Sequence, residues 1–338
     1  MNAGAAPVGP GVDTADALLD VRDLTVAFYG RGRPVVANRH VSLRVAPAET
    51  LGVVGESGSG KSVLCRAMLR LLPTPPAHVT ARSIRFDGTE LTQATEAQMR
   101  RIRGTAVGMV FQNPMTSLSA VWPIGDQVTE GLRIHRGLSR GEARDRGIEL
   151  FQRIGIPDAA RRYDDYPYQW SGGMLQRAVI AMAMACGPRL LLADEPTTAL
   201  DVTIQAQILA LLAELQAASG MALVLVSHDI AVIAETCDRI VVMYAGIVVE
   251  QGAVRDVFAN PKHPYTLGLM RSSPSMETQS ARLQPIPGQP PDLSETGVGC
   301  PFAPRCALAT DACRDEPVAL REVAPGHASA CRYPERVA

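Results

Sequence analysis

The sequence has almost no excess of charge of either sign, since its 338 residues include 33 basic and 34 acidic side chains and carry a net charge of −1. Proteins that bind nucleic acid normally show a strongly basic face, so this balance argues against nucleic acid as the partner. Long apolar runs are also missing: the longest, Ala178–Cys186 and Met221–Val226, fall well short of the roughly 18 residues needed to cross a bilayer. Any contact with a membrane is therefore expected to be peripheral.

A secretory leader is missing as well. The first 17 residues are rich in Ala, Gly and Pro and have neither a basic segment nor a continuous apolar one, so no signal peptide is expected. We predict a disordered tail over residues 1–17. The length of the chain and a hydrophobic content of 46% fit one large folded domain with an appendage, and the sequence shows no internal repeat.

Strands alternate with helices along the rest of the chain. The hydrophobic pattern predicts strands over Leu18–Val26, Val35–Val45, Thr50–Val54, Val107–Phe111, Leu190–Ala193 and Ala222–Val226. It predicts helices over Lys61–Leu72, Met174–Cys186 and Ile204–Ala218, and prolines end the first of them. The first two strands are typical of an antiparallel sheet, whereas the later alternation predicts an α/β fold on a mainly parallel sheet. A polar helical insertion is expected at about residues 113–175.

A glycine-rich loop follows the predicted strand Thr50–Val54 and begins a helix. It consists of Gly55, Glu56, Ser57, Gly58, Ser59, Gly60, Lys61, Ser62 and Val63. In this context the spacing predicts a phosphate-binding loop, because glycines let backbone N–H groups converge on phosphate oxygens. Lys61 would reach the β and γ phosphates and the Ser62 hydroxyl would ligate Mg²⁺. The alternative, a glycine turn that only begins a structural helix, does not explain the Lys-Ser pair.

Four polar side chains follow predicted core strands. Asp194 and Glu195 come after four apolar residues, Gln112 follows Val107–Phe111, and His228 follows Ala222–Val226. Open α/β sheets bind ligands at the carboxyl ends of their strands, so these residues are candidates for one site. Asp194 would hold Mg²⁺ and Glu195 would polarise the attacking water. Alone, the acidic pair is equally typical of a solvated loop or a helix cap, and a lone Gln or His after a strand is usually a loop residue.

The segment Ser171, Gly172, Gly173 and Met174 resembles the signature motif of ABC-type ATPases. A small hydroxyl and two glycines at the start of a helix present N–H groups and a positive dipole end to an anion. An ordinary serine cap with a Gly-Gly turn is the alternative. It is disfavoured because the other motifs occur in the order of that family.

The resemblance covers roughly residues 18–338 and implies further roles. Phe28, or else Tyr29, would stack on adenine; Asp201 would lie in the D-loop; His228 would contact the γ-phosphate. Mg²⁺ would be held through Ser62, Gln112 and Asp194. The implied fold is a P-loop NTPase (RecA-like) core with an antiparallel β subdomain, an inserted helical subdomain and a small Cys-rich C-terminal extension. The domains would span residues 18–262 and 263–338.

Several longer segments are similar to the oligopeptide/dipeptide importer class of this family. They are Phe111–Leu118, Asp194–Thr203, His263–Thr266, Gly288–Pro291 and Cys300–Cys306. The resemblance implies an ATPase that couples hydrolysis to peptide uptake. Uptake of nickel or another small solute remains open, and a non-transport ABC ATPase acting on nucleic acid is the rival from another class. Intact Lys61, Asp194, Glu195 and His228 argue against a catalytically inactive nucleotide binder.

Four cysteines, Cys300, Cys306, Cys313 and Cys331, lie within the last 39 residues. Without an export signal a reducing compartment is expected, so a metal site is favoured over disulfides. Their spacing fits neither zinc ribbons nor ferredoxin runs, and four thiolates suit tetrahedral Zn²⁺ or a 4Fe–4S cluster. The importer class holds an iron–sulfur cluster in this segment in some members, which favours the cluster, with Zn²⁺ as the alternative.

The resemblance also implies partners. ABC ATPases act as head-to-tail pairs, so Ser171 and Gly173 would complete the site of a second ABC ATPase subunit, expected to be a related but different chain. Two transmembrane permease subunits and an extracytoplasmic solute-binding protein would complete the importer, and Trp122 and Pro123 would help to receive a permease helix. The ATPase would lie at the cytoplasmic face of the inner membrane.

Overall fold

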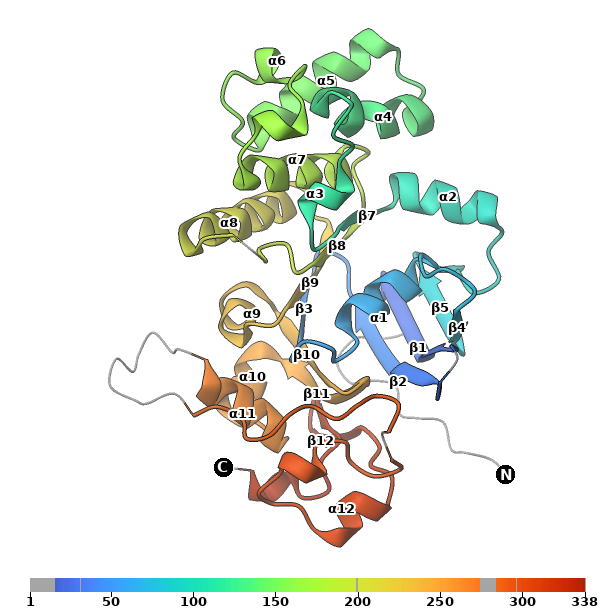
Figure 1. Cartoon of the computed structure of the whole chain (residues 1–338), viewed down its shortest axis with the longest axis vertical. Coiled ribbons are helices and arrows are strands. Elements are labelled where there is room, and N and C mark those ends of the chain that lie inside the picture. Colours follow the sequence, from blue (N-terminus) through green and yellow to red (C-terminus); the bar gives the residue numbers. More distant parts are fainter. Residues whose placement is uncertain (1–15, 31, 199, 274–283, 296, 338) are drawn as a thin grey trace. The chain divides into compact units, whose positions relative to one another are not determined.

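The computed structural model describes residues 16–30, 32–198, 200–273, 284–295 and 297–337. Most of the predicted tail over residues 1–17 therefore lies outside the described residues. The chain forms two compact units: the residues up to Gln93 and from Leu225 onward make up the first, and Ala94–Val224 make up the second. Each unit is described separately below (Figure 1).

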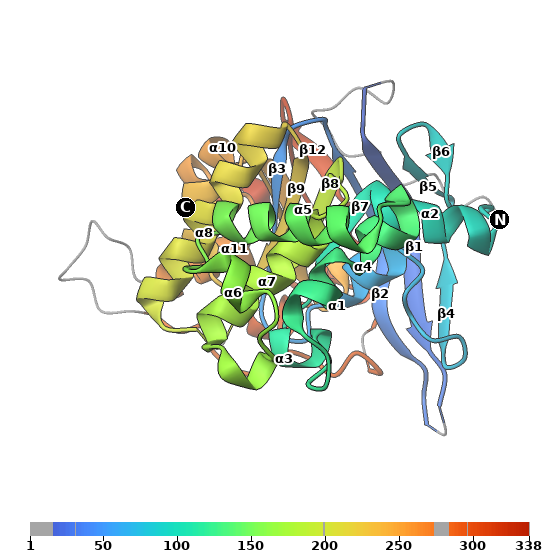
Figure 2. The same ribbon diagram turned by 90° about the horizontal axis from the view of Figure 1, so that it is seen from above.

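The first unit begins with an antiparallel sheet, as the alternating pattern predicted. Strand β1 pairs with β2 from Leu19 opposite Val45 to Phe28 opposite Val35, and with β4 and β5 on its other edge. The strands of this sheet are β1 (Leu19–Phe28), β2 (Val35–Val45), β4 (Ala77–Thr80), β5 (Ser83–Phe86) and β6 (Thr89–Glu90). Figure 2 shows β1, β2 and β4 side by side.

Five strands of a second, eight-stranded sheet belong to this unit, in the order β12-β13-β11-β10-β3. Its strands are β3 (Thr50–Val54), β10 (Arg239–Tyr244), β11 (Ile247–Ala253), β12 (Arg321–Ala324) and β13 (His327–Ser329). β3 and β10 run parallel and both are buried, as expected for strands covered on both faces. The helices are α1 (Lys61–Met68), α9 (Ile230–Thr236), α10 (Val254–Ala259), α11 (Pro264–Ser272) and α12 (Asp311–Asp315), with short 3-10 turns η2 (Ala303–Arg305) and η3 (Pro334–Arg336).

Helix α1 is shorter than predicted. It ends at Met68 rather than Leu72, because Arg70 adopts a left-handed backbone conformation with φ of 53°. The Arg70 N–H donates to Ala67 O and the Leu71 N–H donates to Arg66 O, the pattern of a Schellman cap. The chain therefore leaves the helix before it reaches the prolines.

The C-terminal segment packs within the first unit around the buried carboxylate of Glu250. Strand β13 pairs with β11, and the fully buried Glu250 of β11 is 2.7 Å from Nε2 of His327 on β13. Glu250 also accepts the backbone N–H groups of Lys262 (2.6 Å) and His263 (2.9 Å). Burial lowers the pKa of His263 to about 3, and its neutral ring accepts the Tyr265 N–H through Nδ1.

The second unit contains the parallel pair β7 (Val107–Val110) and β8 (Leu190–Asp194). Its helices are α2 (Glu96–Thr105), α3 (Pro114–Ser117), α4 (Ile124–Arg136), α5 (Arg140–Arg153), α6 (Ala159–Arg162), α7 (Gly172–Met184) and α8 (Val202–Ser219), with a 3-10 turn η1 (Pro167–Gln169). Every element between β7 and α7 is helical, as the pattern at about residues 113–175 predicted. α2 and α5 begin with capping boxes, Thr95 with Gln98 and Ser139 with Glu142. The last strand, β9 (Ala222–Ser227), contains the boundary between the units.

Helix α8 differs from the expectation that no segment is long and apolar enough to cross a membrane. Among the described residues α8 alone, with 18 residues, is long and apolar enough to do so. A helix packed in the core of a protein can have the same length and composition. α8 buries Ile208, Leu211, Leu212 and Leu215 and carries the exposed Glu214, the pattern of a helix packed on one side.

We expect Glu250→Ala to loosen the end of the chain. The substitution leaves two backbone N–H groups and the His327 ring without their buried acceptor, which costs about 3 kcal/mol of unfolding free energy. Urea unfolding measures this loss, and limited proteolysis would show earlier cleavage beyond residue 320. The control is Glu316→Ala, which removes an exposed pair with Arg332 in the same segment and should cost less than about 1 kcal/mol. Equal losses in the two variants would contradict the assignment.

Candidate functional site

The predicted phosphate-binding loop lies in the first unit between β3 and α1. The Lys61 side chain folds back over the loop, and its ammonium group donates to Gly55 O (2.7 Å), Glu56 O (3.0 Å) and Ser59 Oγ (3.4 Å). Only 4% of Lys61 is exposed. Because a buried ammonium group is stable only when it is hydrogen-bonded, these acceptors fix the loop around the lysine.

Two glycines of the loop have no room for a side chain. Gly60, the residue before α1, has φ of +98°, and a Cβ there would lie 2.3 Å from Ala37 O. A Cβ on Gly55 would lie 2.2 Å from Met243 O. The loop is therefore packed against backbone on both sides, and the side chain of Asn38 adds a hydrogen bond to Gly60 O (3.1 Å).

Two residues contact the phosphate loop although the sequence analysis named them only as members of longer motifs. They are Tyr265 and Arg305, and both contact Glu56. The Glu56 N–H donates to the Tyr265 hydroxyl at 2.8 Å. The Glu56 carboxylate accepts both terminal nitrogens of Arg305, at 2.6 and 3.1 Å. Tyr265 and Arg305 lie 209 and 249 residues further along the chain, so no local pattern could reveal either contact.

The second unit brings together Gln112 and Glu195. Gln112, which follows β7, donates through Nε2 to the Glu195 carboxylate at 2.8 Å. Thr198 Oγ1 donates to the same carboxylate oxygen at 3.0 Å. Glu195 has φ of 48°, a conformation that costs a non-glycine residue about 1–3 kcal/mol and is enriched at functional sites. Asp194, the last residue of β8, is fully buried.

The segment that resembles the signature motif begins helix α7 in the second unit. Ser171 is the N-cap, and its Oγ accepts the Met174 N–H at 3.4 Å. Ser171 and Gly172 are exposed, whereas a Cβ on Gly173 would meet Ile204 at 2.9 Å. Asp201 caps the neighbouring helix α8 by accepting the Ile204 N–H at 3.0 Å. The rest of the predicted D-loop includes Ala199, which lies outside the described residues.

The remaining predicted site residues lie in the first unit. Phe28 ends β1 and is half-buried. Tyr29 is 56% exposed, and its ring meets the edge of His78 at 6.1 Å between centroids. His228 directly follows β9 and is exposed. Which of Phe28 and Tyr29 would meet the adenine stays open.

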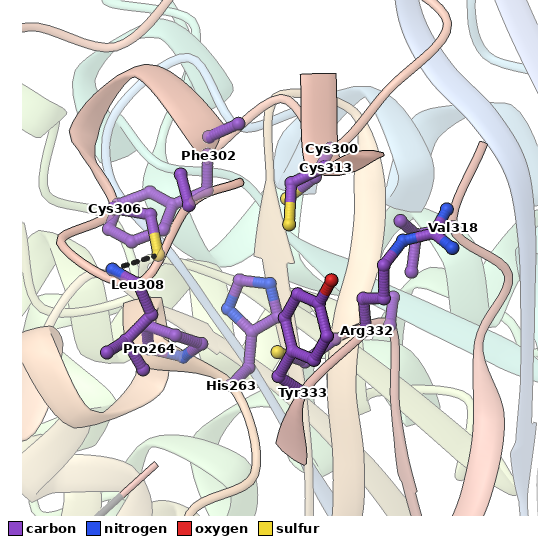
Figure 3. A pocket seen from close by; sticks show the side chains of 14 residues that line it. His263, Pro264, Cys300, Phe302, Cys306, Leu308, Cys313, Val318, Arg332 and Tyr333 are labelled. Atoms are coloured by element: carbon purple, nitrogen blue, oxygen red, sulfur yellow. Dashed lines mark hydrogen bonds between the residues drawn. The ribbon is translucent and has the colours of Figure 1, made fainter. Parts of the chain in front are cut away.

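All four clustered cysteines line one cavity of the first unit, called the cysteine cavity here (Figure 3). His263, Phe302 and Tyr333 also line it. Burial raises the pKa of Cys300 to about 11 and raises those of Cys306 and Cys331, which favours neutral thiols. The cysteines are free. Within the described part of the chain, no three His, Cys, Asp or Glu side chains are grouped so as to hold one metal ion.

Comparison with known proteins identifies the family. The ABC transporter family matches residues 38–198, and the family described as the C-terminal region of oligopeptide/dipeptide transporters matches residues 249–313. The "Probable peptide ABC transporter ATP-binding protein y4tR" of Sinorhizobium fredii is 50% identical over 318 residues, which cover 94% of this chain and 95% of the relative. The dipeptide transport ATP-binding protein DppD of Escherichia coli is 48% identical over 94% of this chain and 97% of its own length.

Comparison with solved structures leads to the same family. A dimeric ATP-binding cassette in a post-hydrolysis state, bound to ADP and Pi, superposes with a TM-score of 0.63 at 28% identity, over 70% of this chain and 99% of that one. The chain therefore belongs to the ABC transporter family of ATP-binding proteins. Its fold is that of a P-loop NTPase, as predicted, and it is an ATPase coupled to transport.

We expect Gly60→Ala to destabilise the phosphate loop more than Gly58→Ala. Both glycines have positive φ, but a Cβ on Gly58 would meet nothing within 4 Å. The strain of the conformation alone costs about 1–2 kcal/mol, whereas the collision of Gly60→Ala with the Ala37 carbonyl should bring the loss to about 3 kcal/mol or more. Thermal unfolding of the nucleotide-free protein compares the two variants, and an equal loss would show that the close packing around Gly60 is unimportant.

Proposed function

We propose that this chain is the ATP-hydrolysing subunit of an importer of dipeptides or oligopeptides. The observation that carries the proposal is the 48% identity with a dipeptide transport ATP-binding protein over 94% of the chain. The match of residues 249–313 to the C-terminal region of oligopeptide/dipeptide transporters supports it independently. Uptake of nickel or another small solute is the alternative, because the ATPase subunit does not itself select the cargo.

Lys61 is proposed to bind the β and γ phosphates. In the structure its ammonium group donates to the carbonyl groups of Gly55 and Glu56. Charged phosphate oxygens form stronger hydrogen bonds with an ammonium group than neutral carbonyl oxygens do, so ATP would draw Lys61 from the loop carbonyls. The Gly-rich backbone, from Gly55 to Val63, would supply N–H groups to the same phosphates.

Magnesium is proposed to be held by the Ser62 hydroxyl, the Asp194 carboxylate and the Gln112 side chain. Hard oxygen donors of this kind fit Mg²⁺. The Gln112 amide N–H donates a hydrogen bond to Glu195, so the amide oxygen is the atom that would ligate the metal. Bound Mg²⁺ would neutralise charge that develops on the phosphates.

Glu195 is proposed as the residue that accepts a proton from the attacking water. Gln112 and Thr198 both donate to its carboxylate, and these hydrogen bonds fix its orientation. His228 would contact the γ-phosphate, and Phe28 or Tyr29 the adenine. These roles follow the family pattern, and the held geometry of Glu195 supports the first of them.

A second ABC ATPase subunit, expected to be a related chain, is the proposed partner at the signature segment. The exposed start of α7 at Ser171 and Gly172 presents N–H groups of the kind that bind phosphate. A relative of known structure is a dimer with ADP and Pi. The Asp201 segment would face the same partner.

Two permease subunits and an extracytoplasmic solute-binding protein complete the proposed importer, with this chain at the cytoplasmic side of the inner membrane. The segment before α4 exposes Val121 (77%) and Trp122 (60%). Trp122 is therefore not a core residue, and with Pro123 it is a candidate contact for a permease helix.

The cysteine cavity is proposed to hold an iron–sulfur cluster, with Zn²⁺ as the alternative. In the described residues no three of these thiols are grouped so as to hold one metal ion, so binding of either group would have to draw the cysteine side chains together. The support for this proposal is that Cys300, Cys306, Cys313 and Cys331 line one cavity although up to 31 residues separate them. Four thiols are a donor set for soft metals. Cysteine ligands bind as thiolates, so the raised pKa values mean that binding would release protons.

We expect Glu195→Gln to keep ATP binding and to lower kcat by about 10²- to 10⁴-fold, since a general base contributes that much. A fluorescent ATP analogue measures binding and phosphate release measures turnover. Glu214→Gln, an exposed change on α8, is the control and should leave both unchanged. Turnover at the wild-type rate, or loss of ATP binding together with turnover, would refute the assigned role.

We expect anaerobically purified protein to contain iron and acid-labile sulfide in similar amounts, about four of each per chain. Cys306→Ser should abolish both, whereas Cys186→Ala, which lies outside the cavity, should not. Elemental analysis and visible absorption measure the content. Zinc without sulfide would contradict the cluster and support a Zn²⁺ site. The absence of any metal from fresh protein would contradict both the cluster and the Zn²⁺ site.

A further inference from the structure

The phosphate loop is tied directly to the segment that carries the cysteines. Arg305, one residue before Cys306, donates to the Glu56 carboxylate at 2.6 and 3.1 Å. It donates in addition to Tyr244 Oη (3.2 Å) and to the carbonyl of Pro287 (2.8 Å). Only 5% of the Arg305 side chain is exposed. A buried, bidentate guanidinium–carboxylate pair fixes the orientation of the Glu56 side chain and also compensates its charge.

The same loop residue carries the contacts of Lys61. The Glu56 carbonyl and the adjacent Gly55 carbonyl accept the Lys61 ammonium group, and the Glu56 N–H is held by Tyr265. The peptide groups on both sides of Glu56 are thus held by Lys61, and the one before Glu56 is held in addition by Tyr265 from a distant part of the chain. Any shift of Glu56 moves the acceptors that Lys61 must leave when it binds phosphate.

An aromatic cluster continues this link to the cysteine cavity. The ring of Tyr244 lies 4.6 Å from that of Tyr265 and 5.2 Å from that of Phe302, between centroids. Phe302 also contacts Tyr265 at 5.4 Å and lines the cavity beside Cys300 and Cys306. Phe302 and Arg305 therefore hold the cysteine segment and the phosphate loop as one packed body.

The positive charge of Arg305 compensates the negative charge of Glu56, which matters for the binding of ATP to the loop. Burial lowers the pKa of Arg305, but the hydrogen bonds to Glu56 and Tyr244 outweigh this and raise it, so the guanidinium stays charged. Without Arg305 an uncompensated carboxylate would stand in a loop that binds a polyanion. The negative charges of the Glu56 carboxylate and of the phosphates would repel one another and oppose the binding of ATP.

We propose that Arg305 is a positioning residue for ATP binding: it neutralises Glu56 and fixes the Gly55–Glu56 backbone that holds Lys61. This inference rests on the proposed phosphate-binding role of the loop. It makes the cysteine segment part of the nucleotide site, because Arg305 lies within it and its neighbours line the cysteine cavity.

The test measures ATP affinity of the full chain for Arg305→Met, Glu56→Gln and the double variant. Arg305→Met should weaken ATP binding about tenfold, equivalent to about 1.4 kcal/mol, and raise KM by a similar factor while kcat changes less than about twofold. The double variant should bind ATP more tightly than Arg305→Met alone, because it no longer carries the uncompensated carboxylate. Arg305→Lys keeps the charge but loses the bidentate geometry, so its affinity should lie between those of the wild type and Arg305→Met. It takes the place of Arg305→Met in the test if that variant folds poorly. Arg314→Met, in the same segment but exposed, is the control.

Two outcomes would overturn the proposal: unchanged affinity in Arg305→Met, or effects of the two substitutions that multiply in the double variant as for independent residues. Lys61→Ala separates this failure from a failure of the site itself. If Lys61→Ala abolishes ATP binding while Arg305→Met has no effect, the phosphate site stands and the role of Arg305 falls. If Lys61→Ala leaves binding intact, the site assignment is wrong and Arg305 has no phosphate loop to position.

Discussion

The burial of the Lys61 ammonium group is the constraint on which the nucleotide site depends. A desolvated ammonium needs an acceptor for its protons, and the loop supplies Gly55 O, Glu56 O and Ser59 Oγ. The carbonyls can turn toward the lysine only because the loop follows a path that Gly55 and Gly60 permit. The loop is therefore shaped around a cation, and in the proposed function ATP binding would be an exchange of acceptors rather than the ordering of a loose segment.

That shape is held from outside the loop, by the last third of the chain. Tyr265 and Arg305 contact Glu56, and both belong to a region that is packed by Glu250 through His263 and His327. The segment after Tyr265 has few apolar runs of its own, so it depends on the sheet strand β11 for its place. The described residues from Leu225 onward accordingly belong to the same compact unit as the phosphate loop. The predicted boundary between residues 262 and 263 remains a prediction about the chain rather than a division seen in the structure.

The parts of the fold that could be predicted from the sequence are those whose cause is local. β2 and β3 begin and end where the hydrophobic pattern predicted, and the helix predicted over Met174–Cys186 forms as α7 over Gly172–Met184. The end of α1 was missed because it depends on a left-handed Arg70, a conformation that no sequence pattern marks for arginine. The contact of Arg305 with Glu56 was missed because it joins two motifs 249 residues apart. The strained backbone of Glu195 was equally invisible, since only its neighbours in space explain it.

The two carboxylates that the sequence places in nucleotide motifs are held by different donors. Glu56 is paired with a permanently charged guanidinium, which compensates its charge and makes it a structural anchor of the loop. Glu195 accepts hydrogen bonds from the Gln112 amide and the Thr198 hydroxyl, which fix the direction of its carboxylate. A carboxylate beside a phosphate must have its charge compensated, because like charges repel, whereas a general base must be aimed at the water whose proton it takes. The donors on each carboxylate therefore fit the separate roles proposed for the two residues.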